Sequence, residues 1–123
     1  MAAPNIIGAT TINGKTVGTN LSTTNATTVL NNANGSGKCL KVNTLNVANY
    51  GANSAIVTVN FNNAANLGGT NFPIVGNVVI PAFSTLNVID KTSQYYLEEN
   101  QSLGATTGTS NVITVTCSYE EIS

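Results

Sequence analysis

The side chains that could carry out acid–base chemistry in this chain of 123 residues are five carboxylates, because the sequence contains no His. They are Asp90 and the adjacent pairs Glu98, Glu99 and Glu120, Glu121. A general acid and base must share one face at a defined separation, whereas neighbouring residues of a strand point to opposite faces. We therefore expect both pairs to be solvated strand ends and predict no catalytic residues. No loop has the alternating carboxylates of a calcium site, so we expect neither a metal nor a cofactor.

Two cysteines, Cys39 and Cys117, are the candidate nucleophiles. No His accompanies them as a base, so a catalytic thiol is not supported. Their separation along the chain would permit a disulfide, but in a reducing cytoplasm buried thiols are the better interpretation. We predict two reduced thiols in the core.

Tyr95 and Tyr96 are adjacent in an expected strand, which places one ring on each face. One interpretation is a core ring beside a rim ring. The alternative is a stacking platform for a sugar, which would make the chain a carbohydrate-binding module with its Asn-rich loops as partners in binding.

The element that must position these residues is the C-terminal segment, residues 111–123. Ile113, Val115, Cys117 and Tyr119 alternate there with polar or smaller residues, which is the period of a strand with one buried face. A strand placed last is stable only if earlier strands offer it edges. The rest of the chain should therefore build the sheet that this strand closes.

The upstream sequence predicts further short strands and no helix. Asn13-Gly14 between β-favouring residues predicts an early hairpin. A switch of apolar parity in a strand over 38–50 predicts either a bulge near Asn43-Thr44 or burial on both faces. We expect the strand over 54–61 to pair with it. The fold class is all-β, a single β-sandwich, jelly-roll-like, with about eight to nine short antiparallel strands. Residues 11–123 form this domain, and residues 1–10 form an N-terminal arm.

The composition is polar but nearly uncharged. Only 7% of residues are charged, while 20 Asn and 18 Thr fill the positions of the missing charges. The net charge is -1 and Arg is absent, so the chain lacks the basic surface that nucleic acids or anionic membranes require. We predict no nucleic-acid or membrane partner, and synthesis in a cytoplasm.

Two stretches, Ser84–Gly104 and Val115–Ser123, carry a family resemblance. With Thr11-Ile-Asn-Gly-Lys-Thr at the start, they resemble small virion structural proteins of tailed bacteriophages, especially those of marine and cyanobacterial hosts. The most specific parts are Val88-Ile-Asp-Lys and Cys117-Ser-Tyr-Glu-Glu-Ile. The family pattern has a Gly-Asp turn where this chain has Asn100-Gln101, and Asn also tolerates the left-handed conformation of such a turn.

The resemblance implies a non-enzymatic virion component, made in the host and located in the particle. We expect a capsid decoration or cement protein bound to the major capsid protein, with a neck, tail or fibre accessory protein as the alternative. Few charges protect the strand edges, so we also expect a homo-oligomer, with a trimer favoured. The predicted subunit or capsid contacts flank the closing strand and are Pro4, Ile6, Ile7, Tyr119 and Ile122.

Overall fold

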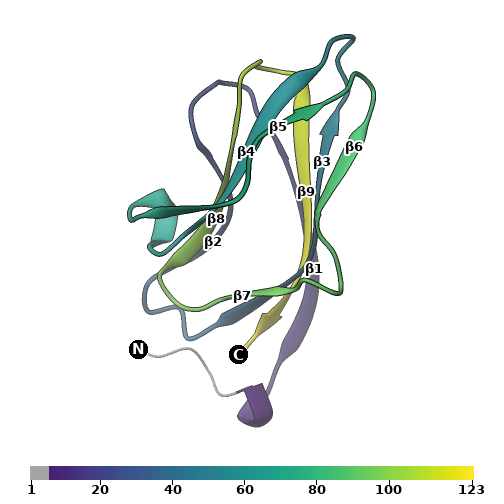
Figure 1. Cartoon of the computed structure of the whole chain (residues 1–123). Coiled ribbons are helices and arrows are strands. Elements are labelled where there is room, and N and C mark those ends of the chain that lie inside the picture. Colours follow the sequence, from purple (N-terminus) through teal and green to yellow (C-terminus); the bar gives the residue numbers. More distant parts are fainter. Residues whose placement is uncertain (1–5) are drawn as a thin grey trace.

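The computed structural model describes residues 6–123, which fold into two antiparallel sheets packed face to face (Figure 1). The elements in chain order are η1 (Ile6–Gly8), β1 (Ile12–Asn20), β2 (Thr27–Asn32), β3 (Cys39–Asn49), β4 (Ala55–Asn62), η2 (Ala65–Leu67), β5 (Asn71–Ile80), β6 (Thr85–Ile89), β7 (Tyr95–Leu97), β8 (Gln101–Thr107) and β9 (Ile113–Ile122). The predicted all-β, jelly-roll-like sandwich is confirmed.

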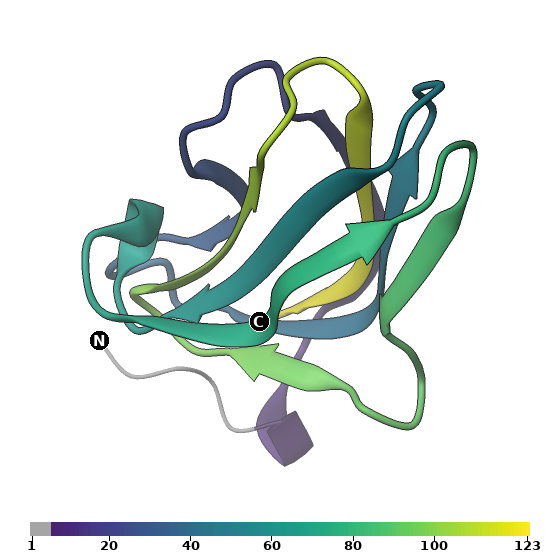
Figure 2. The same ribbon diagram turned by 45° about the horizontal axis from the view of Figure 1, so that its top comes forward.

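One sheet has the strand order β1-β9-β3-β6, with β7 also pairing with β3, and the other has the order β2-β8-β4-β5 (Figure 2). Consecutive strands therefore alternate between the sheets in most places, as in a double-sheet jelly roll. The closing strand β9 lies between β1 and β3. Earlier strands thus offer it edges, as the sequence predicted. The bulge near Asn43-Thr44 is also confirmed, because the β3–β9 register shifts between Val42 and Thr44.

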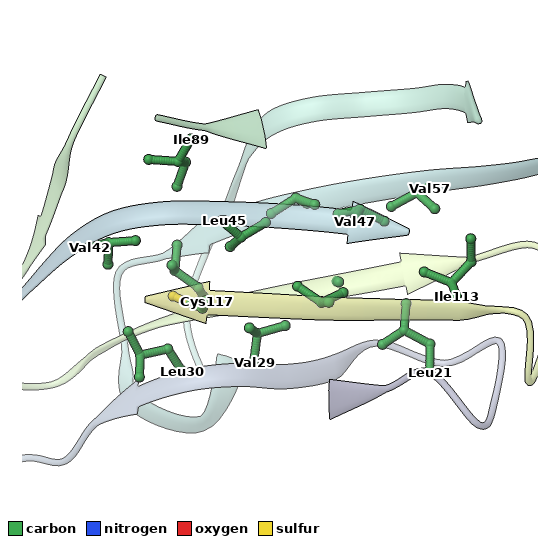
Figure 3. Packing of buried hydrophobic residues seen from close by; sticks show 14 of the residues in the cluster. Leu21, Val29, Leu30, Val42, Leu45, Val47, Val57, Ile89, Ile113 and Cys117 are labelled. Carbon is green, nitrogen blue, oxygen red and sulfur yellow. The ribbon is translucent and has the colours of Figure 1, made fainter. Parts of the chain in front are cut away.

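The core lies between the sheets and consists of branched aliphatic side chains with Cys117 among them (Figure 3). In β9 the alternating residues Ile113, Val115 and Cys117 are fully buried. In β4 the matching residues are Ala55, Val57 and Val59. Burial of each such aliphatic side chain contributes about 1.5–3 kcal/mol, so alternation in facing strands provides the driving force for closing the sandwich.

The predicted hairpin at Asn13-Gly14 is wrong. Both residues lie inside β1, which pairs with β9 from Ile12 opposite Ile122 to Asn20 opposite Thr114 without a register shift. An Asn-Gly turn requires positive φ at both positions, and neither residue has it. The long ladder to β9 outweighs the local turn preference.

The predicted pairing of the 54–61 strand with its predecessor is also wrong. β4 pairs with β5 and β8 in the opposite sheet, so residues 50–54 cross between the sheets. Gly51 permits this crossing, because a Cβ there would lie 2.8 Å from Cγ1 of Val112. Alternation of apolar residues identifies the buried face of a strand but not the sheet to which it belongs.

Three consecutive strands, β2, β3 and β4, each end in a buried Asn, and these are Asn32, Asn49 and Asn62. The Asn49 amide nitrogen donates to the carbonyls of Ile80 at 3.0 Å and Asn53 at 2.8 Å, and its oxygen accepts from the N–H of Gly51 at 2.9 Å. Buried polar groups are stable only when bonded in this way. These amides fix the loops at the two ends of the sandwich.

Candidate interaction surfaces

The nine charged side chains are confined to one sheet and the segments that continue it. They lie on β1, β3 and β9 or in the segments 33–38, 90–94 and 98–100, and none lies on β2, β4, β5 or β8. We call the end of the sandwich with the loops 33–38, 63–70 and 98–100 the charged end. The C-terminus lies at this end (Figure 1).

Ion pairs between the glutamates of β9 and three lysines connect neighbouring segments at the charged end. Glu121 Oε1 lies 3.1 Å from Lys38 Nζ and its Oε2 lies 3.3 Å from Lys15 Nζ. Glu120 lies 3.9 Å from Lys41 and accepts a hydrogen bond from Asn43. Hydrogen bonding to Lys38, with a smaller contribution from Lys15, holds the pKa of Glu121 below its ordinary value. Glu120 and Glu121 therefore have a structural role, because their side chains connect β9 to β1 and β3.

Glu98 and Glu99 do not occupy strand positions as predicted. They follow β7 in the turn to β8, where the Glu98 N–H donates to Gln101 Oε1 at 2.9 Å. Both carboxylate oxygens of Glu99 are buried and have no hydrogen-bond partner in residues 6–123. The expectation of a solvated carboxylate is thus wrong for Glu99.

The predicted contact residues differ in their accessibility. Pro4 lies outside the described residues, as does the side chain of Ile6. The Ile7 side chain is 96% exposed. Tyr119 is partly buried and packs against the core, while Ile122 is only 3% exposed, opposite Cys39 and Ile12. The Ile122 side chain is therefore buried within the single chain, and the five contacts stay predictions.

Residues 1–10 were predicted to form an N-terminal arm, which stays a prediction because residues 1–5 lie outside the described part of the chain; the structure shows how the chain is held just before β1. The backbone N–H groups of Thr10 and Thr11 both donate to the carbonyl of Ser123, at 2.8 and 2.9 Å. The N–H of Ser123 donates back to Thr11 at 2.9 Å. The N-terminal segment and the C-terminus therefore leave the sandwich at one place.

The two cysteines are free and buried, as predicted. Cys39 lies opposite Ile122 and Cys117 opposite Leu45 in the β3–β9 ladder. This register separates them by about 17 Å along the strands, far beyond the Cα separation of about 7 Å that a disulfide tolerates. Burial raises the pKa of Cys117 to about 12 and also raises that of Cys39. Neither thiol is a competent nucleophile.

Tyr95 and Tyr96 are a core ring and a rim ring, as the first interpretation predicted. Tyr95 packs against the core, whereas Tyr96 is 46% exposed. A sugar platform at this site would thus have one available ring, and this hypothesis stays a prediction.

The opposite end of the sandwich was missed by the sequence reasoning. We call it the neutral end, and it consists of the loops 21–26, 50–54, 81–84 and 108–112 (Figure 1). These loops lie together, because the N–H of Tyr50 donates to Val112 and the Asn49 side chain donates to Pro81. The chain has no charge from Val42 to Ile89, and this gap is the signal that could have identified the surface.

Large apolar side chains are exposed at or beside the neutral end. Phe83 is 74% exposed in the turn between β5 and β6, and Tyr50 is 51% exposed. Ile56 and Val79 are cross-strand neighbours, 46% and 57% exposed. Phe83 also has a φ of 56°, a left-handed conformation that is unusual for a bulky residue. An exposed aromatic ring is thus held on a strained backbone at a surface without charge.

Two further observations concern ligands and membranes. Among the residues that the structure describes, no three His, Cys, Asp or Glu side chains lie close enough together to hold a metal ion. No helix in the described part of the chain is long and apolar enough to cross a membrane.

The sequence matches no protein-family model and no curated protein. Among solved structures, the chain is similar to one in the cryo-EM structure of the extra small virus (XSV) VLP of the giant freshwater prawn Macrobrachium rosenbergii. The match has a TM-score of 0.50 and 11% sequence identity, and it covers 97% of this chain and 82% of that chain. At this identity the likeness is one of fold, and it extends over nearly the whole domain.

Proposed function

We propose that this chain is a virion structural protein without enzymatic activity. The observation that carries the proposal is the fold likeness, which covers 97% of this chain, to a chain of a virus particle. The resemblance of Ser84–Gly104 and Val115–Ser123 to phage virion proteins supports the same class. So does a surface with few charges and a net charge of -1. Many copies packed side by side would repel one another if each carried a large net charge.

Within this class we propose a capsid decoration or cement protein of a tailed bacteriophage, bound to the major capsid protein. The anchored N-terminal segment and the neutral end are its candidate contact surfaces. A neck, tail or fibre accessory protein with the same fold is the alternative. The two differ in copy number, because a decoration protein follows the capsid lattice whereas a tail component follows the low symmetry of the tail.

Quantitative mass spectrometry of purified particles tests the proposal. We expect the chain in the particle, in a fixed ratio to the major capsid protein. A small number of copies per particle would instead support the tail alternative. Absence from particles would contradict the virion role itself. Particles that lack the protein should lose resistance to heat or osmotic shock, and unchanged resistance would argue against a cement function.

A further inference from the structure

In the described part of the chain, the two sheets end in the strands β1, β6, β2 and β5, and the three-residue β7 lies beside β6 along β3. Three of the four terminal strands carry features that discourage pairing with another chain. β5 contains Pro73, and its register with β4 shifts around Gly76-Asn77. β2 has a register shift between Thr28 and Leu30. β6 has only five residues and a shift in its pairing with β3. The fourth edge, β1, has no Pro and no register shift over nine residues.

The free edge of β1 presents a regular row of backbone groups. Thr11 and Ser123 exchange both backbone hydrogen bonds, each at 2.9 Å, so Thr11 directs its N–H and C=O toward the C-terminal strand. Backbone groups alternate in direction along an antiparallel strand. The even-numbered residues, Ile12, Gly14, Thr16, Gly18 and Asn20, therefore direct their N–H and C=O groups away from β9.

Most of β1 is exposed to solvent. Residues 12–16 are exposed without exception, and Ile12 is 57% exposed. The sequence of β1 provides no charge on its free edge beyond Lys15, which pairs with Glu121. An extended chain could therefore approach this edge along its full length.

Two glycines of β1 have no explanation within the single chain. A Cβ at Gly14 or Gly18 would meet nothing within 4 Å, and neither residue has a positive φ. Glycine inside a strand is unfavourable by about 0.5–1 kcal/mol relative to Ala, and it often marks a place where another backbone approaches closely. The two glycines are symmetric about Thr16, the middle residue of the strand.

We propose that β1 pairs with β1 of a second copy of this chain, antiparallel across a two-fold axis at Thr16. This register places Thr16 opposite its own copy, Gly14 opposite Gly18, and Ile12 opposite Asn20. All five outward-facing residues of each strand then form hydrogen-bonded pairs. Lys15 lies opposite Val17, so no like charges meet directly. The two sheets join into one, and both unprotected edges are covered.

An isologous contact of this kind closes at two copies, so it predicts a dimer where the sequence-based expectation favoured a trimer. The inference goes beyond the virion role and does not depend on it, because it concerns the purified protein. Light scattering should give twice the 12.6 kDa of one chain. A monomer at the highest soluble concentration, or a trimer, would overturn it.

Substitution with cysteine tests the register. Thr16→Cys should form an interchain disulfide under mild oxidation, because the two residues 16 face each other. The matched control is Thr85→Cys, which places an exposed cysteine on β6 at the other edge of the same sheet. The native thiols are buried and do not interfere. Cross-linking of both variants to the same extent, or of neither, would contradict the proposed register.

A charge at the axis tests the energetics. Thr16→Lys places like charges opposite each other and should weaken the dimer on the order of tenfold, with partial recovery at high salt. Thr85→Lys adds the same charge at the other edge and should leave the dissociation constant unchanged. Circular dichroism should show that both variants remain folded. Equal effects of the two substitutions would overturn the proposal.

Discussion

Both ends of the sandwich contain buried amides, Asn32 and Asn62 at the charged end and Asn49 at the neutral end, but the ion pairs lie at the charged end. At the charged end, Glu120 and Glu121 form ion pairs with lysines of β1, β3 and the loop before β3. At the neutral end, the Asn49 amide bonds the loops 50–54 and 81–84 with no charge involved. Surface ion pairs contribute at most about 1 kcal/mol each, whereas a buried amide leaves several groups unsatisfied when removed. Substitution of Asn49 should therefore cost more stability than the loss of one ion pair at the charged end.

The second sheet, with the strand order β2-β8-β4-β5, contains no charged side chain. Five of the nine charged side chains take part in ion pairs at the charged end, so the fields of these five largely cancel there. The remaining surface relies on Asn and Thr for solubility and can pack against neighbouring molecules without opposing charges. The predictions below test this division, from the largest expected effect to the smallest.

The largest expected effect is the difference in alkylation rate between Cys39 and Cys117. Cys39 is 4% exposed near the charged end, and Cys117 is fully buried in the middle of the core. In the native protein we expect alkylation of Cys117 to be slower than in the unfolded protein by a factor of about 1,000 or more, because reaction requires opening of the core. Cys39 should react first. Mass spectrometry after timed alkylation measures both rates, and rapid labelling of Cys117 would contradict the buried position.

Asn49→Ala should reduce the free energy of unfolding by about 3 kcal/mol, because the carbonyls of Ile80 and Pro81 and the N–H of Gly51 lose their partner. Asn53→Ala is the control, since the Asn53 side chain is exposed. Urea unfolding measures both. Similar midpoints for Asn49→Ala and the control would mean that the amide does not hold the neutral end.

Glu99→Gln should stabilise the protein by about 1–2 kcal/mol, because it replaces a buried carboxylate that has no partner in the described structure with a neutral amide. Glu121→Gln should instead destabilise the protein, because it removes the ion-pair partner of Lys38 and Lys15. Thermal unfolding of the two variants gives the comparison. Destabilisation by both would mean that Glu99 has a favourable interaction as well.

Phe83→Asn should stabilise the isolated protein by about 0.5–1 kcal/mol, since Asn accepts the left-handed backbone more readily than Phe does. Little apolar burial is lost, because Phe83 is 74% exposed. If the neutral end contacts other virion proteins, the same variant should bind particles less well. Loss of stability would show that the exposed ring supports the fold.

The pH dependence of the charged end should be small and of defined sign. The pKa of Glu121 is lowered from 4.5 in the folded chain, so its contribution is complete above the unfolded value and is lost as the pH falls through the lowered folded value. Thermal unfolding of the wild type and Glu121→Gln should therefore differ near neutral pH and converge in acid. If the difference in melting temperature between the two proteins stayed constant from neutral to acid pH, ionisation of Glu121 would not contribute to stability.

The sequence by itself determined the class of fold and the buried face of its last strand. Ile113, Val115 and Cys117 alternate with polar residues, and such a period fixes which side chains enter a core whatever their partners. The bulge near Asn43-Thr44 was predictable for the same reason, since a change of parity requires an extra residue. The thiols were predicted to be buried and unpaired because a reducing cytoplasm disfavours disulfides.

Only the tertiary structure decided which strands meet. Asn13-Gly14 became part of β1 because β9 offers a continuous ladder, and β4 joined the opposite sheet because the buried Asn49 and the close approach at Gly51 direct its loop there. The candidate surfaces depended on the same long-range contacts. Ile122 is buried because β1 and β3 flank it, and β1 has a free edge because, within residues 6–123, β9 is the one strand that pairs with it. Local patterns carry no information about partners distant in the sequence, and such partners define both edges and surfaces.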